Sequence, residues 1–105
     1  MIKKIRIVLL FLLLGSLLHA VEQPNRGAVL YKQCAGCHGP DGKNKAFGKS
    51  GIIAGQSVED LKESLAFYKA SDFKTLSSVS VMVKQVKNLS DEDLNEVSNF
   101  ISKLK

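Results

Sequence analysis

Two cysteines and a histidine stand together in a C-x-x-C-H pattern at Cys34, Cys37 and His38. Cysteines three positions apart on one helical turn project from the same face. Each thiol can then form a thioether with one vinyl group of a haem, while the adjacent histidine binds the iron. The intervening Ala35 and Gly36 are small, so a porphyrin could lie close to the backbone. The pattern therefore indicates haem c attached at Cys34 and Cys37, with His38 as an iron ligand.

Three other interpretations of this motif remain open. It could be a buried turn of helix that happens to hold two cysteines. A structural zinc site needs about four protein ligands, but Cys34, Cys37 and His38 are the only cysteines and histidine beyond residue 20. A redox-active dithiol expects a strand–helix–strand context, and no strand signal precedes the motif.

Elimination predicts Met82 as the second iron ligand. It is the only methionine beyond residue 20, and no second histidine is available there. Histidine with methionine is a common ligand pair for haem c. Met82 follows His38 by 44 residues, enough chain to wrap the haem, and we expect it in an irregular segment rather than on a helix face. The alternatives are a core-filling role beside valines, lysine ligation or an open iron position.

The N-terminus has the pattern of a secretory signal peptide. The first six residues include three bases, residues 7–18 are almost wholly aliphatic, and Ala20 is a small residue suited to cleavage. We expect residues 1–20 to be a signal and residues 21–105 to be one domain. A retained membrane anchor is the alternative, although the apolar run is shorter than the roughly 20 residues of a spanning helix.

The charge balance gives no case for nucleic-acid binding. The formal net charge of +5 includes three bases within residues 1–6, so removing the signal lowers it to +2. The remaining lysines are scattered, and no basic run with interleaved aromatics is present.

Because covalent haem attachment follows export, the signal and the haem motif together predict a periplasmic protein.

Three helices are expected, and strand signals are weak. The first runs from about residue 25 to 34. The second begins at Ser57 and the third at Ser90, each serine followed three residues later by an acid, Asp60 or Asp93. Apolar residues then follow both caps at helical spacing. These features predict an all-α domain.

Two segments lack regular helix signals. Residues 39–55 are rich in glycine and include a Pro-Asp-Gly turn, which indicates a long loop. Residues 72–88, which contain Met82, are expected to form a loop or a short helix. Polar and apolar residues alternate in places over residues 77–83, so a short strand is also possible there.

The ordered set of motifs over Gly27–Leu104 resembles short monohaem class I cytochromes c of bacteria. The matching segments are Gly27 and Tyr31, the C-x-x-C-H motif with Gly39, Pro40-Asp41-Gly42, Ile53-Ala54-Gly55-Gln56-Ser57, Val81-Met82, Leu89-Ser90-Asp91-Glu92-Asp93-Leu94 and Phe100-Ile101. The resemblance implies a small cytochrome c fold with three main helices wrapped round one covalently bound haem. It also implies a close crossing of the first and last helices at Gly27, packed round by Tyr31, Leu94, Val97, Phe100 and Ile101.

This chain departs from the family pattern in two places. Val81 stands where many relatives have a proline before the methionine. Residues 51–53 replace a stretch that often holds a proline whose carbonyl accepts the proximal imidazole N–H. We therefore expect a plain backbone carbonyl near His38 to take that role.

The expected function is single-electron transfer, not enzymatic catalysis. The expected partners are redox protein donors and acceptors of a respiratory chain, with no small-molecule substrate and membrane contact only through partner complexes or an uncleaved signal. Lysines 43, 45 and 49 could ring an exposed haem edge or be an ordinary solvated loop. The residues expected to keep the haem dry are Leu30, Phe47, Ile52, Ile53, Leu61, Leu65 and Tyr68. Alternative functions are a haem gas sensor or small peroxidase with an open iron position, or an electron-accepting subunit of a larger periplasmic redox enzyme.

Overall fold

The computed structural model describes residues 25–48, 50–72 and 78–105, and these are helical with no strand. The elements are α2 (Arg26–His38), the 3-10 turn η1 (Ala46–Gly48), α3 (Val58–Ala70), α4 (Ser78–Val86) and α5 (Asp91–Ser102). The predicted all-α class is confirmed. The predicted signal, residues 1–20, lies outside the described residues. Within the described part, no helix has the length and apolar character needed to cross a membrane.

Helix α2 is longer than predicted and contains the whole cysteine–histidine motif. It continues beyond Cys34 to His38 and stops at Gly39, whose φ of 83° favours glycine. The Gly39 N–H donates to the Ala35 carbonyl at 2.8 Å, which satisfies one of the last carbonyls of the helix. The motif is therefore presented from a rigid element.

Side-chain caps start α3 and α5 where the sequence predicted. The Ser57 hydroxyl accepts from the Asp60 N–H at 3.1 Å. At α5 the exchange is reciprocal: the Ser90 hydroxyl accepts from the Asp93 N–H, and the Asp93 carboxylate accepts from the Ser90 N–H. Each cap satisfies N–H groups that have no partner within the helix.

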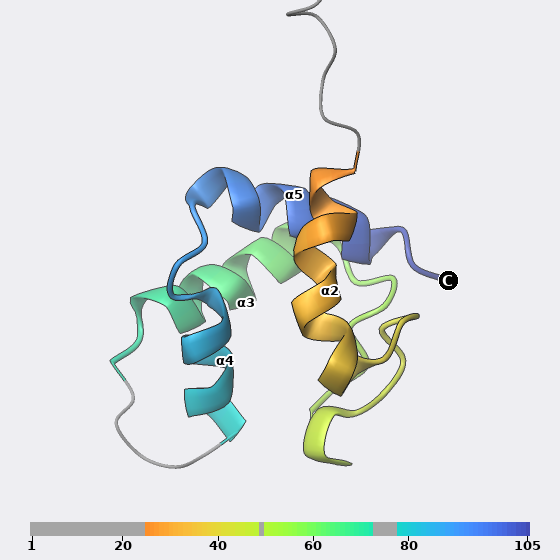
Figure 1. Ribbon diagram of the computed structural model, residues 1–105, viewed down its shortest axis with the longest axis horizontal. Coiled ribbons are helices and arrows are strands. Elements are labelled where there is room, and N and C mark those ends of the chain that lie inside the picture. The colour runs from red at the N-terminus through yellow and green to blue at the C-terminus, as the bar shows by residue number, and fades with distance from the viewer. Residues whose placement is uncertain (1–24, 49, 73–77) are drawn as a thin grey trace, which may run out of the picture.

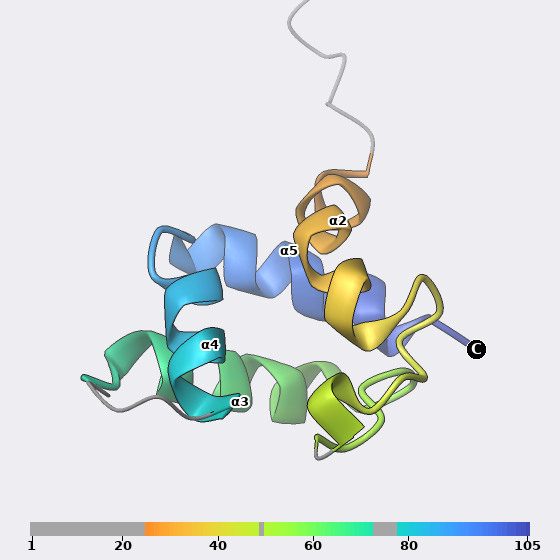
Figure 2. The same ribbon diagram turned by 60° about the horizontal axis from the view of Figure 1, so that its bottom comes forward.

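Helices α2 and α5 cross in close contact (Figures 1 and 2). At Gly27 an added Cβ would lie 2.4 Å from the Glu96 carbonyl oxygen and 2.8 Å from the Phe100 Cβ. The Tyr31 and Phe100 rings pack beside this point, with centroids 5.3 Å apart. Tyr31 also belongs to a buried cluster with Leu61, Val97 and Ile101. The crossing implied by the resemblance is confirmed.

The segment that carries Met82 contains a short helix, one of the two forms expected for residues 72–88, so the expectation that Met82 lies in an irregular segment rather than on a helix is wrong. Residues 78–86 form α4, which packs chiefly against α3 (Figure 1). The possible strand is wrong for residues 78–83. The alternating β-branched valines suggested a strand, but Val79, Met82 and Val86 also follow helical spacing and line one cavity. Burial of that helical face outweighs the local preference.

Replacing Gly27 by alanine should push α2 away from α5. The added methyl group would clash with the Glu96 carbonyl oxygen and the Phe100 Cβ, and neither atom can rotate aside. We expect a loss of about 1–3 kcal/mol in the free energy of unfolding, typical of overpacking. Gly51→Ala is the control for an added methyl group, since its Cβ would meet nothing within 4 Å and it lies outside the haem attachment motif. Denaturant unfolding of both variants measures the difference. Equal stability of the two would show that the crossing is not tight.

Replacing Asp93 by asparagine should destabilise the protein in a pH-dependent way. The Ser90 backbone N–H, followed by Arg26 with its guanidinium 3.0 Å away, lowers the pKa of the Asp93 carboxyl. A lowered folded-state pKa gives stability that is present above the unfolded-state pKa of about 4 and is lost as the pH falls through the folded-state value. The stability gap between wild type and Asp93→Asn should therefore be largest near neutral pH and shrink in acid.

The control for Asp93 is Glu92→Gln, which removes the same charge from the same first turn but leaves the cap intact. Thermal unfolding across a pH series measures both variants. A gap for Asp93→Asn that does not change with pH would contradict the ionic contribution.

Candidate functional site

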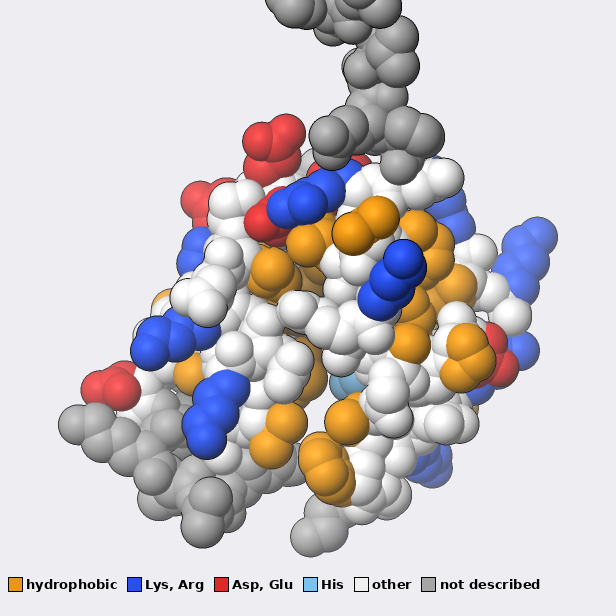
Figure 3. All heavy atoms as spheres, viewed as in Figure 1, with side chains coloured by type: hydrophobic (Ala, Val, Ile, Leu, Met, Phe, Trp, Pro, Cys, Tyr) orange, Lys and Arg blue, Asp and Glu red, His pale blue; other side chains and the backbone are white. Residues whose placement is uncertain are grey.

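An apolar cavity lies between α2 and η1 on one side and α4 on the other. Its volume is about 290 Å³, close to the lower end of the range for small-molecule sites. Figure 3 shows this opening, with apolar side chains on both sides and the pale-blue side chain of His38 at its edge. The residues lining it are Gln33, Cys34, Cys37, His38, Ala46, Phe47, Ser50, Leu65, Tyr68, Val79, Val81, Met82, Gln85, Val86, Leu89, Val97 and Ile101.

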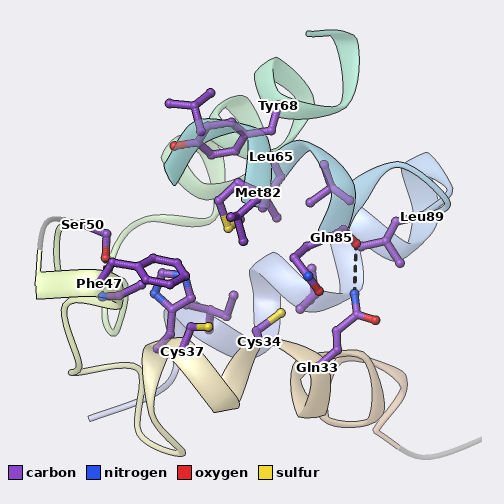
Figure 4. A pocket seen from close by; sticks show the side chains of 17 residues that line it. Gln33, Cys34, Cys37, Phe47, Ser50, Leu65, Tyr68, Met82, Gln85 and Leu89 are labelled. Atoms are coloured by element: carbon purple, nitrogen blue, oxygen red, sulfur yellow. Dashed lines mark hydrogen bonds between the residues drawn. The ribbon is translucent and has the colours of Figure 1, made fainter. Parts of the chain in front are cut away.

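The α2 wall of the cavity carries the motif. Figure 4 shows the Cys34 and Cys37 sulfurs pointing from α2 into the cavity. No disulfide joins them; Cys34 is half-buried and Cys37 is exposed at the mouth. Burial raises the pKa of the Cys34 thiol, with a smaller contribution from Cys37. Both sulfurs are thus available to one group held in the cavity.

The opposite wall carries Met82. Figure 4 shows its sulfur directed into the cavity from α4, facing the side on which Cys34 and Cys37 lie. The structure therefore brings Cys34, Cys37, His38 and Met82 to one cavity, although they are separated by up to 48 positions in the chain. A helix rather than a loop presents Met82.

His38 is only 6% exposed, and its surroundings favour the neutral imidazole. Burial lowers the pKa of this side chain, and the neutral form is the one that can bind a metal. Its Nδ1 is buried and has no hydrogen-bond partner among the described residues. We expected a backbone carbonyl to accept a hydrogen bond from this imidazole. Among the described residues that expectation is wrong.

The backbone round His38 is fixed from two sides. The His38 carbonyl accepts from the Asn44 N–H at 3.0 Å, which folds the following loop back on the helix end. The buried Tyr31 hydroxyl donates to the Gly39 carbonyl at 2.5 Å. Burial, with smaller contributions from Cys34 and Asp41, raises the pKa of Tyr31, so it remains a donor. Hydrogen bonds to the His38 and Gly39 carbonyls therefore hold the turn that carries the imidazole.

Of the seven residues expected to keep the haem dry, five line a cavity and two do not. Phe47, Leu65 and Tyr68 line the main cavity, while Ile53 and Leu61 line a smaller adjoining cavity that Met82 also borders. The two exceptions point elsewhere: Leu30 packs against the buried cluster, and Ile52 is 48% exposed.

Sequence reasoning missed the contribution of α4 and α5 to the lining. Val79, Val81, Val86, Val97 and Ile101 complete its apolar surface. The available signal for α4 was the helical spacing of its apolar residues. The polar lining residues Gln33, Ser50 and Gln85 were also missed; no motif marks them.

Two further expectations concern charge and metals. Lys43 and Lys45 are exposed on the loop after α2, and Lys49 lies outside the described residues. Within the described part of the chain, no three histidine, cysteine or acidic side chains are grouped closely enough to share a metal ion. The described residues thus offer no ready-made zinc ligand set.

Comparison with known proteins places the chain in a family. Residues 24–105 match the family model described as Cytochrome c. Cytochrome c-553 of Helicobacter pylori (strain J99) is 35% identical over 103 residues, which cover 98% of this chain and 99% of that protein. Cytochrome c-553 of Nitratidesulfovibrio vulgaris (strain Miyazaki F) is 37% identical over 78 residues, 74% of this chain and 76% of that protein.

A further relative is the cytochrome subunit of sulfide dehydrogenase from Chlorobaculum tepidum, 33% identical over 81 residues, or 76% of this chain and 67% of that protein. Cys34 and Cys37 have the spacing that haem c attachment requires. The chain therefore belongs to the cytochrome c family, whose members carry covalently bound haem c and pass electrons to redox partners rather than act as enzymes.

Proposed function

We propose that this chain is a periplasmic electron carrier whose haem c is ligated by His38 and Met82. The observation that carries the proposal is the arrangement of four side chains. Cys34, Cys37 and His38 border one apolar cavity from α2, and the Met82 thioether enters it from the facing helix. These are the residue types that hold a haem with both axial positions filled.

Each of the four side chains has a distinct role in this proposal. The haem supplies an iron centre that gains and loses one electron. Cys34 and Cys37 would hold it by thioethers, His38 would offer a neutral imidazole, and Met82 would offer a soft thioether, a ligand that raises the reduction potential. The apolar lining excludes water, which together with the ligands tunes the potential. If His38 and Met82 both hold the iron, no coordination position would remain there for a substrate.

The location and domain boundaries follow from the first residues. We propose that residues 1–20 direct export and that residues 21–105 form the mature domain. The basic start, the aliphatic run and Ala20 support this. The family match begins at residue 24, just beyond the proposed cleavage point.

The proposed partners are donors and acceptors of a respiratory chain. Lys43 and Lys45 are exposed on the loop that leaves α2, and Phe47, which follows Lys45 by two positions, lines the cavity. Positive charge there would steer an acidic partner toward the haem edge. The exposed Phe47 at the mouth adds apolar contact area.

A second candidate is the electron-accepting subunit of a larger periplasmic redox enzyme. One relative is named as the cytochrome subunit of sulfide dehydrogenase, which favours this possibility. The haem site would be the same in both cases. Co-purification of a stable enzyme partner with the exported protein would favour the subunit, and isolation as a free protein would favour the shuttle.

Replacing Met82 by alanine should keep the covalent haem and open the iron. The ferrous variant should bind carbon monoxide rapidly, while the wild type should not, because the thioether no longer occupies the sixth position. Absorption spectroscopy before and after adding carbon monoxide measures this. Val81→Ala is the control, since it removes a neighbouring cavity-lining side chain without a ligand atom.

Two results bear on the assignment of Met82. A carbon monoxide response confined to Met82→Ala supports it. A Met82→Ala protein with an unchanged low-spin spectrum and no carbon monoxide binding would refute it.

A further inference from the structure

One hydrogen bond joins the two walls of the cavity. The Gln33 side-chain Nε2 donates to the Gln85 backbone carbonyl at 3.1 Å, linking α2 to α4 (Figure 4). Gln33 directly precedes Cys34, and Gln85 follows Met82 by three residues. Both glutamines line the cavity. The bond therefore connects the neighbourhood of the attachment site with the neighbourhood of the methionine.

The acceptor is a carbonyl that the helix itself leaves unpaired. Gln85 lies in the last turn of α4, which ends at Val86. The last four carbonyls of an α-helix have no partner within it, and they carry the negative end of its dipole. An amide N–H supplied by Gln33 satisfies one of them. Gln33 thus acts as a C-terminal cap that comes from a different helix.

Met82 and Gln85 are three positions apart on α4, so they lie on the same side of the helix. The hydrogen bond from Gln33 holds the Gln85 carbonyl toward α2, and it therefore also holds the face of α4 that carries Met82 toward the cavity. Because α4 otherwise packs chiefly on α3, this contact restrains the helix from the α2 side.

We propose that Gln33 is a positioning residue that holds α4 closed and so keeps the Met82 thioether on the iron. This inference rests on the proposed ligation by Met82. An external ligand can bind ferric iron only when Met82 has left, so its apparent affinity reports the population of the open form. Losing one ordinary hydrogen bond should raise that population about five-fold.

The test is a titration of the ferric holoprotein with imidazole, followed by absorption spectroscopy. Gln33→Ala removes the donor, and Gln33→Glu keeps the length but offers only acceptors when ionised. Both variants should bind imidazole about five-fold more tightly than the wild type. Gln33→Arg keeps a donor and should restore affinity close to that of the wild type. Lys32→Ala is the control on the adjacent exposed position of α2.

Several outcomes would overturn the proposal. Wild-type affinity in Gln33→Ala and Gln33→Glu, with tight binding in Met82→Ala, would leave Met82 as a ligand and remove the role of Gln33. Tighter binding in all three Gln33 variants, including Gln33→Arg, would show that packing rather than the donated hydrogen bond matters. If Met82→Ala itself binds imidazole no better than the wild type, the ligation by Met82 fails, and this inference fails with it.

Discussion

The arrangement of the helices depends on one constraint: their apolar sides face a shared cavity as well as each other. Leu65 from α3, Met82 and Val86 from α4, and Val97 and Ile101 from α5 all border it. Protein interiors are normally packed as densely as organic crystals. Domains below about 70–80 residues usually need a staple or cofactor to complete their core, and residues 21–105 lie just above that limit. A covalently held haem meets that need, since it adds a large apolar body at the point where the helices converge.

The two walls of the cavity are built differently. The α2 wall is closely packed: α2 approaches the backbone of α5 at Gly27, and the Tyr31 hydroxyl donates a hydrogen bond to the Gly39 carbonyl next to His38. The α4 wall rests on α3 and is joined to α2 through the side chain of Gln33. The α2 wall would carry the covalent attachment of the haem. The α4 wall would supply the coordinate bond from Met82, which would help to set the reduction potential. This division suits a carrier whose haem must stay attached while its potential is adjusted.

Features set by a few neighbouring residues could be predicted from the sequence. The caps at Ser57 and Ser90 depend on an acid three positions later, and the structure has both helix starts as expected. The C-x-x-C-H motif likewise fixes its own geometry within one turn. Met82 was singled out because residues 21–105 contain no other methionine and no second histidine, and the structure brings it to the same cavity as the motif; its role as a ligand stays a prediction.

Features set by tertiary packing could not be predicted in the same way. Residues 78–86 contain alternating valines that fit a strand. They form a helix instead, and apolar side chains of that helix border the cavity. Leu30 and Ile52 look as apolar as Leu65, but the rotation of α2 and the path of the loop turn them away. The hydrogen bond from Gln33 to Gln85 joins residues 52 positions apart, and the burial of His38 Nδ1 without a partner among the described residues likewise follows no local sequence pattern.

The central claim is that Cys34 and Cys37 hold a haem covalently, and mass spectrometry of the denatured, exported protein tests it most directly. Treating the unfolded chain with a thiol-alkylating reagent should leave both cysteines unmodified, and the peptide that contains them should carry the mass of one haem. A colourless chain whose two thiols both become alkylated would contradict the account.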